Sequence, residues 1–227
     1  EKEVLRCRRA DLVVLPELFA TGCRMKPDGV GLSRSEAALH YDTIRTRMSR
    51  WSVRTGASIV GSAVCEEEGL HYNRLIVARP DGTFVCYDKH NVFKRGGFTP
   101  GRKRLRFDCH GVRIVPLICY DLRFDEWSRR TPCFDYDLLL YIAAWPASRG
   151  DEWDRLLRER ARENDIPVVG VNFCGKDADG LSFAGASQVL MPDGRIRYRA
   201  GRRSVTKIVR LKIGASGDAA DRAPAKK

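Results

Sequence analysis

Short apolar runs alternate with amphipathic stretches along this chain of 227 residues. The apolar runs are rich in Val, Ile and Leu and are bounded by Gly, Pro or Asp, as is typical of buried β-strands. They predict strands at Leu12–Leu15, Ser58–Ala63, Tyr72–Ala78, Thr83–Asp88, Gly111–Ile118, Leu138–Ile142 and Val168–Asn172. Pro-Asp-Gly sequences at 80–82 and 192–194 supply turn residues and predict two hairpins. The alternation favours a layered α/β protein.

Two stretches between the predicted strands have the periodicity of amphipathic helices. The first follows a capping-box pair, Ser33 and Glu36, and places apolar residues at alternating spacings of four and three. These apolar positions are Ala37, Tyr41, Ile44, Met48 and Trp51. The second stretch runs from Asp151 to Glu163. Each stretch predicts one helix that covers a sheet.

The composition fits a single soluble domain at residues 1–213. Hydrophobic residues make up 43% of the chain, and no apolar run approaches the roughly 20 residues that cross a bilayer. Residues 214–227 are small and polar and predict a disordered tail. The first residues lack the pattern of a secretory signal, and they begin without Met in what reads as a helix, so we expect a truncated start.

The spacing of the cysteines and the net charge limit the classes of function that the chain can have. The eight cysteines have no repeated metal-binding spacing and fit reduced thiols, so we expect a cytoplasmic protein without a zinc site. The net charge of +12 could attract nucleic acid. The basic residues are scattered and lack interleaved aromatic residues, however, so solvated surface charge is the favoured interpretation.

Three reactive side chains follow the ends of apolar strands: Glu17, Lys89 and Cys119. Cys119 closes the run VRIVPLIC at a predicted strand-to-helix turn, where backbone N–H groups can bind an oxyanion. Taken singly, a strand cysteine is usually core packing, and a lone Lys or Glu is usually a surface charge. Together, an ammonium group would favour the thiolate, and a carboxylate could carry the thiol proton to a leaving amine.

The segments around these residues resemble the nitrilase, or carbon–nitrogen hydrolase, superfamily over nearly the whole chain. VVLPELFATG, YDKHNVF and VPLICYDLRFDEWSR occur in the family's order, and DLLLYIAAWPASR, RARENDIPVVGVN and FAGASQVLMPDG add to the likeness. The resemblance implies a four-layer αββα sandwich, apparently without its first strand, and a reaction that requires no metal or other cofactor. It also implies that Glu17 is the general base, Lys89 stabilises the tetrahedral intermediate, Cys119 is acylated and the Tyr120 N–H helps to bind the oxyanion.

CYDLRF followed by YDLLLYIAAWP most resembles the omega-amidase branch, which acts on the terminal amide of 2-oxo acid amides such as 2-oxoglutaramate. The resemblance makes Tyr120, Phe124, Trp145 and Arg149 the expected pocket residues, with Arg149 pairing with a substrate carboxylate. Two other readings stay open. One is a family member acting on an N-carbamoyl compound, a nitrile or a deaminated-glutathione-like amide. The other is a catalytically impaired member that acts as an interaction protein.

Departures from the family pattern motivate these alternatives. Relatives usually carry a second glutamate after the lysine, but no Asp or Glu lies between Lys89 and Asp108 here. Asn91 and Ala144 stand where relatives usually have His and Asn.

Related sandwiches commonly pack their helices against a second subunit, so we expect a homodimer. The Arg-rich loop 94–106 would repel its own copy unless acidic residues lie opposite it. Asp125, Glu126 and Asp135 are the expected acidic residues, and such pairing would make the dimer sensitive to salt.

Overall fold

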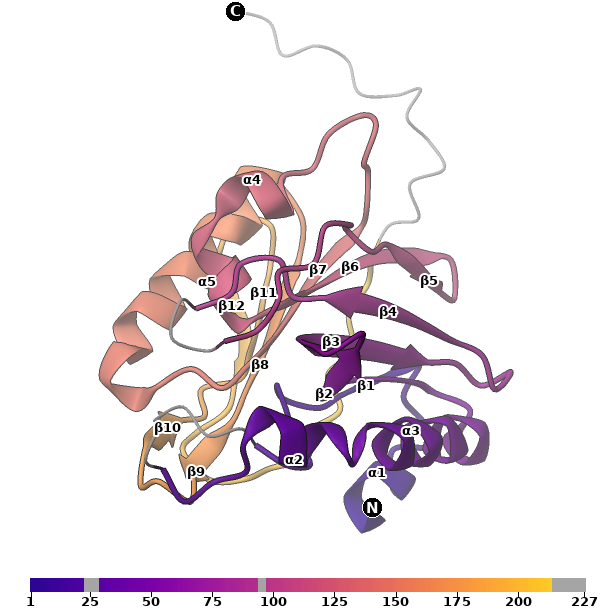
Figure 1. The fold of residues 1–227 in the computed structure, drawn as a ribbon. Coiled ribbons are helices and arrows are strands. Elements are labelled where there is room, and N and C mark those ends of the chain that lie inside the picture. Colours follow the sequence, from indigo (N-terminus) through magenta and orange to yellow (C-terminus); the bar gives the residue numbers. More distant parts are fainter. Residues whose placement is uncertain (23–28, 94–96, 214–227) are drawn as a thin grey trace, which may run out of the picture.

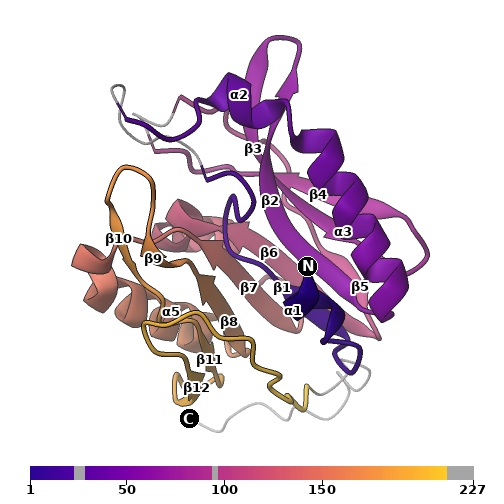
Figure 2. The ribbon, with the colours of Figure 1, turned by 90° about the horizontal axis from the view of Figure 1, so that it is seen from below.

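The computed structural model describes residues 1–22, 29–93 and 97–213 and has four layers, with helices on the outer faces of two packed sheets (Figure 1, Figure 2). The first sheet has the strand order β1-β2-β3-β4. Its strands are β1 (Leu12–Val14), β2 (Ser58–Glu67), β3 (Leu70–Ala78) and β4 (Phe84–Asp88). β1 runs parallel to β2, and the other pairs are antiparallel.

The second sheet has six strands in the order β12-β11-β8-β7-β6-β5. These strands are β5 (Phe107–Cys109), β6 (Val112–Ile118), β7 (Leu138–Ala143), β8 (Val168–Asn172), β11 (Gln188–Leu190) and β12 (Ile196–Arg199). β6, β7 and β8 are parallel at the centre, and the outer pairs are antiparallel. A separate two-stranded ribbon joins β9 (Cys174–Lys176) and β10 (Ser182–Ala184). The predicted αββα architecture and both hairpins are confirmed.

Helices α1 (Lys2–Leu5), α2 (Arg34–Ala38) and α3 (Tyr41–Thr55) lie outside the first sheet, and α5 (Gly150–Asn164) lies outside the second (Figure 2). The short elements η2 (Cys119–Arg123), α4 (Asp125–Ser128) and η3 (Ala147–Arg149) connect the strands of the second sheet. No helix in the described part of the chain is both long enough and apolar enough to cross a membrane.

The prediction of one continuous helix through Ala37 and Trp51 is wrong, because the helix breaks between α2 and α3. The two pieces pack against different parts of the core. Ala37 contacts the small cluster around Leu18 and Val64, whereas Met48 and Trp51 belong to the larger cluster under the first sheet. The turn at Leu39 lets both pieces bury their apolar faces, and it leaves Leu39 itself exposed.

The principal core lies between the two sheets. Val60 and Val77 of the first sheet pack there with Leu117 and Leu139 of the second. Ile59, the neighbour of Val60, instead packs in the cluster that includes α3, because successive strand residues point to opposite faces. β2 is therefore buried on both sides over its first eight residues, which explains why this part of the strand carries no charged residue.

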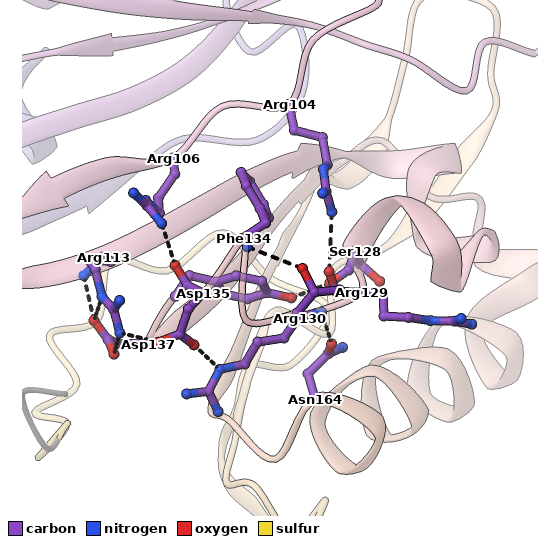
Figure 3. Close-up of polar contacts among 12 residues, drawn as sticks. Arg104, Arg106, Arg113, Ser128, Arg129, Arg130, Phe134, Asp135, Asp137 and Asn164 are labelled. Carbon is purple, nitrogen blue, oxygen red and sulfur yellow. Dashed lines mark hydrogen bonds and ion pairs between the residues drawn. The ribbon is translucent and has the colours of Figure 1, made fainter. Parts of the chain in front are cut away.

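The basic segment that precedes β5 forms hydrogen bonds with a later segment of the same chain (Figure 3). Arg106 donates to the backbone carbonyl of Asp135 over 2.8 Å, and the Asp135 side chain pairs with Arg113 and Arg130. Asp125 likewise pairs with Arg129 within α4 and its end. Asp125 and Asp135 thus already form ion pairs inside the chain. They would have to give up these partners in order to pair with the Arg-rich loop of a second copy. The homodimer stays a prediction.

Candidate functional site

Glu17 lies just after β1 and is almost completely buried, with 6% of its surface exposed. Its Oε1 accepts hydrogen bonds from Lys89 Nζ and Asn73 Nδ2, both over 2.7 Å. Its Oε2 accepts from the backbone N–H of Ala144 over 2.9 Å. Asn73 belongs to the first sheet and Ala144 follows β7 of the second, so this carboxylate joins the two sheets.

Lys89 directly follows β4 and is also buried. Its N–H donates to the Asn73 carbonyl over 3.0 Å, which continues the pairing with β3. Its carbonyl accepts from the Gly101 N–H over 2.9 Å. A Cβ atom at position 101 would lie 2.0 Å from the Asp88 carbonyl oxygen, so only glycine allows this close approach. The backbone of Lys89 is therefore held on both sides.

Cys119 is the first residue of η2 and follows β6 without a connecting loop. Its φ of 47° lies in the left-handed region, where a residue with a Cβ atom is strained. Such strain persists only where the surroundings impose it, and it often marks functional sites. The Cys119 thiol lies beside the Glu17 carboxylate and the Ala144 N–H, which both act on its pKa. The structure thus brings Glu17, Lys89 and Cys119 together at one place.

The charge state follows from these contacts. Burial pushes the pKa of Glu17 up, but the Lys89 charge and its hydrogen-bond donors outweigh burial and hold this pKa below its usual value. Burial pushes the pKa of Lys89 down, but the Glu17 charge outweighs it and raises this pKa. Burial and the adjacent Glu17 charge raise the pKa of Cys119, and Lys89 offsets this only in part. At rest the site therefore holds an ionised Glu17–Lys89 pair and a neutral thiol.

Lys89 lowers the pKa of the Cys119 thiol, as expected of an ammonium group, but burial and the Glu17 charge raise this pKa by more. Glu17 accepts a hydrogen bond from Lys89 and lies beside Cys119, so its negative charge compensates that of the ammonium group at the sulfur. A thiol with a raised pKa can pass its proton to a neighbouring carboxylate as it attacks, rather than before.

Alkylation by iodoacetamide at pH 7 checks the neutral thiol. We expect the exposed Cys133 to be labelled at least about 10-fold faster than Cys119, because the thiolate is the reactive form, the pKa of Cys119 is raised, and Cys119 is less exposed than Cys133. Peptide mass spectrometry gives the two rates in the same sample. Faster labelling of Cys119 would show that its resting form is the thiolate.

Of the predicted pocket residues, Tyr120 and Phe124 lie edge to face with ring centroids 5.4 Å apart, and Tyr120 directly follows Cys119. Trp145 is buried, and its indole N–H donates to the Arg149 carbonyl over 2.8 Å. The Arg149 side chain is 56% exposed and lies 3.8 Å from Glu152. Within the described residues, no contact joins its guanidinium group to the three central side chains.

Sequence reasoning missed three polar residues of this region. Asn73 and Asp121 are 1% and 0% exposed, and Asn73 binds Glu17 directly. Arg123 lies over the rings of Tyr120 and Trp145 and donates to Glu152 over 2.7 Å. A polar residue inside an apolar strand, such as Asn73, was an available signal. Asp121 and Arg123 lie within CYDLRF, the segment that begins with Cys119.

Comparison with protein families gives one match, to the carbon–nitrogen hydrolase model over residues 2–219. The chain is 39% identical over 197 residues to the omega-amidase YafV of Yersinia enterocolitica, covering 85% of this chain and 73% of that one. It is 31% identical over 203 residues to the 2-oxoglutaramate amidase of Bacillus subtilis, covering 86% of this chain and 75% of that one.

Solved structures agree with this match. XC1258 of Xanthomonas campestris, described as a CN-hydrolase superfamily protein with an arsenic adduct in its active site, superimposes with a TM-score of 0.75. It is 34% identical, and the match covers 85% of this chain and 74% of that one. An amidase of Nesterenkonia, in a mutant whose active-site cysteine has added acrylamide, gives a TM-score of 0.77 at 25% identity over 88% of this chain and 80% of that one.

Proposed function

The chain belongs to the carbon–nitrogen hydrolase family, and we propose that it hydrolyses the terminal amide of a small 2-oxo dicarboxylic acid, with 2-oxoglutaramate as the representative substrate. The observation that carries the proposal is the buried Glu17–Lys89 pair placed against the Cys119 thiol. This arrangement has a nucleophile, a proton acceptor and a fixed positive charge, which together serve acyl transfer.

The first half of the reaction forms a thioester. The Cys119 sulfur attacks the amide carbon while its proton passes to Glu17. The Lys89 ammonium group and the Tyr120 N–H stabilise the negative oxygen of the tetrahedral intermediate. The carbon–nitrogen bond then breaks, and Glu17 returns the proton to the departing amine, which leaves as ammonia.

The second half hydrolyses the thioester. Glu17, again ionised, takes a proton from water as the water oxygen attacks the acyl carbon. The carbon–sulfur bond breaks, the sulfur recovers a proton from Glu17, and the acid leaves. Each cycle consumes one amide and one water and yields one acid and one ammonia.

Arg149 is our proposed partner for the substrate carboxylate. Its guanidinium group is half-exposed and only loosely paired with Glu152, at 3.8 Å, so it can accept a new anionic partner. Arg123 makes a direct 2.7 Å bond to the same Glu152 and lies over two aromatic rings, which makes it less available.

Ammonia release from a substrate panel tests the proposal. The panel contains 2-oxoglutaramate, an aliphatic amide without a carboxylate, an N-carbamoyl amino acid and a nitrile. We expect the highest kcat/KM for 2-oxoglutaramate, together with an acyl adduct on the Cys119 peptide in mass spectrometry. A preference for the carbamoyl compound or the nitrile would redirect the assignment within the family. No turnover and no adduct with any compound would favour the interaction protein.

The pH dependence of kcat/KM gives a second check. The pKa of Glu17 is lowered, so its ionised form, which accepts the thiol proton, is present above that pKa and is lost as the pH falls through it. We therefore expect the acid limb below about pH 4.3, the ordinary glutamate value. Circular dichroism at each pH separates titration from unfolding. An acid limb centred near pH 6 in folded protein would contradict the ionised pair.

A further inference from the structure

Asp121 is a fully buried carboxylate two residues after Cys119. Its Oδ2 accepts from the Tyr87 hydroxyl over 2.8 Å and from the Ile118 N–H over 3.0 Å. Its Oδ1 accepts from the N–H and the side-chain Nδ2 of Asn91, over 2.7 and 3.1 Å. Neither oxygen lies against Glu17, so this carboxylate has no direct part in the chemistry proposed above.

These contacts require an ionised carboxylate. Tyr87 Oη already accepts from the His90 N–H over 3.1 Å and from the Trp127 indole over 3.0 Å, so its own proton points to Asp121. All four groups around the Asp121 carboxylate are then donors. A protonated acid or an amide would place a hydrogen against a donor on at least one side. Burial raises the pKa of Asp121 above its usual value, and the Lys89 charge and these donors oppose that rise only in part, so the case for the ionised form rests on the four donors.

The hydrogen-bond partners of Asp121 lie on both sides of Lys89 and immediately before Cys119. Tyr87 and Asn91 stand two residues before and two residues after Lys89, on the segment that leaves the first sheet. Ile118 immediately precedes Cys119, at the end of β6 in the second sheet. The Asp121 carboxylate therefore bonds the residues on both sides of Lys89 to the turn that carries the Cys119 thiol. A shift of the reacting groups by about 1 Å can cost about 100-fold in rate.

We propose that Asp121 is a positioning residue for this reaction, which holds the segment 87–91 against the Cys119 turn and so sets the place of the Lys89 ammonium group relative to the sulfur. The inference rests on the proposed amide hydrolysis for its kinetic consequence. Its structural content, the attachment of the two segments, is independent of the substrate.

Asp121→Asn tests this proposal, with Asp137→Asn as the matched control. Asp137 is also buried and accepts three hydrogen bonds from Arg113, at 2.8 to 2.9 Å (Figure 3). It precedes β7, whereas Cys119 follows the parallel strand β6, so the two residues lie at opposite ends of these strands. Two quantities are measured in each variant: kcat and KM for 2-oxoglutaramate, and the rate of amide hydrogen exchange in residues 87–93. Thermal unfolding shows that each variant is folded.

For Asp121→Asn we expect kcat to fall by at least about 30-fold, with KM changed by less than about 3-fold, because the transition state is misaligned while substrate binding is kept. Exchange at 87–93 should rise at least about 10-fold, since the Asn91 N–H loses a charged acceptor. Asp137→Asn should lose stability but keep wild-type kcat and wild-type exchange at 87–93. Unchanged exchange or unchanged kcat in folded Asp121→Asn overturns the proposal.

Two further comparisons test the proposal if Asp121→Asn does not fold or if the wild-type protein hydrolyses no amide. If Asp121→Asn does not fold, Asn91→Ala removes only the side-chain donor and should lower kcat about 3- to 10-fold, whereas wild-type kcat would contradict the proposal. If the wild-type protein hydrolyses no amide, the function proposed above fails. The exchange comparison between Asp121→Asn and Asp137→Asn then still decides whether Asp121 holds the two segments together.

Discussion

The Cys119→Ser protein should fold as the wild type does and should hydrolyse 2-oxoglutaramate at least about 100-fold more slowly. Oxygen and sulfur differ little in volume, so the half-buried surroundings of Cys119 tolerate the exchange. The serine hydroxyl has a much higher pKa than a thiol and needs a stronger base than the ionised Glu17. The left-handed backbone at position 119 is kept, so the loss reports on chemistry rather than on the turn.

The matched control for this prediction is Cys133→Ser, at the exposed cysteine. It should keep wild-type kcat, and both serine variants should keep the wild-type circular dichroism spectrum. Ammonia release and mass spectrometry of the acyl adduct measure the effect. Wild-type turnover by Cys119→Ser would remove Cys119 from the mechanism.

Glu17→Gln should lower both activity and stability. The amide nitrogen of glutamine would face a donor, either Lys89 Nζ or the Ala144 N–H, and Lys89 would lose its buried counter-charge. Breaking a buried ion pair by removing one partner costs about 3–5 kcal/mol of the free energy of unfolding. Loss of the proton carrier should lower kcat by about 100- to 10,000-fold. Urea unfolding and ammonia release measure the two effects.

Glu67→Gln is the corresponding control at the surface. Glu67 pairs with Arg74, but its side chain is 55% exposed, and Arg74 keeps a second partner in Asp88. The free energy of unfolding should change by less than about 1 kcal/mol, and kcat should be unchanged. A Glu17→Gln protein with the stability and turnover of Glu67→Gln would exclude Glu17 as both counter-charge and base.

The positions of Glu17, Lys89 and Cys119 could be predicted because each follows an apolar strand whose direction the sheet fixes. Strand periodicity is local, so β1, β4 and β6 are visible in the sequence within one or two residues of their ends. The resemblance of the surrounding motifs then singles out these three side chains among many charged residues. What they do in the reaction stays a proposal.

The protonation state of Cys119 could not be predicted from the same segments. It depends on the charge of Glu17 beside the sulfur, which brings together residues more than 100 positions apart in the sequence. The break between α2 and α3 could not be predicted either, because it depends on where Ala37 packs in the folded chain. Ala144 illustrates a different limit. Its side chain departs from the family pattern, but the site uses its backbone N–H, which nearly every residue type provides.

The same contacts bear on how the catalytic centre forms during folding. Glu17 of the first sheet is bonded to Ala144 of the second, and Asp121 of the second is bonded to Tyr87 of the first. Neither sheet alone contains a complete centre. A refolding intermediate with both sheets formed but not yet docked would show native far-ultraviolet dichroism and no hydrolysis. Enzyme activity would therefore return only when the two sheets dock and the principal core between them forms.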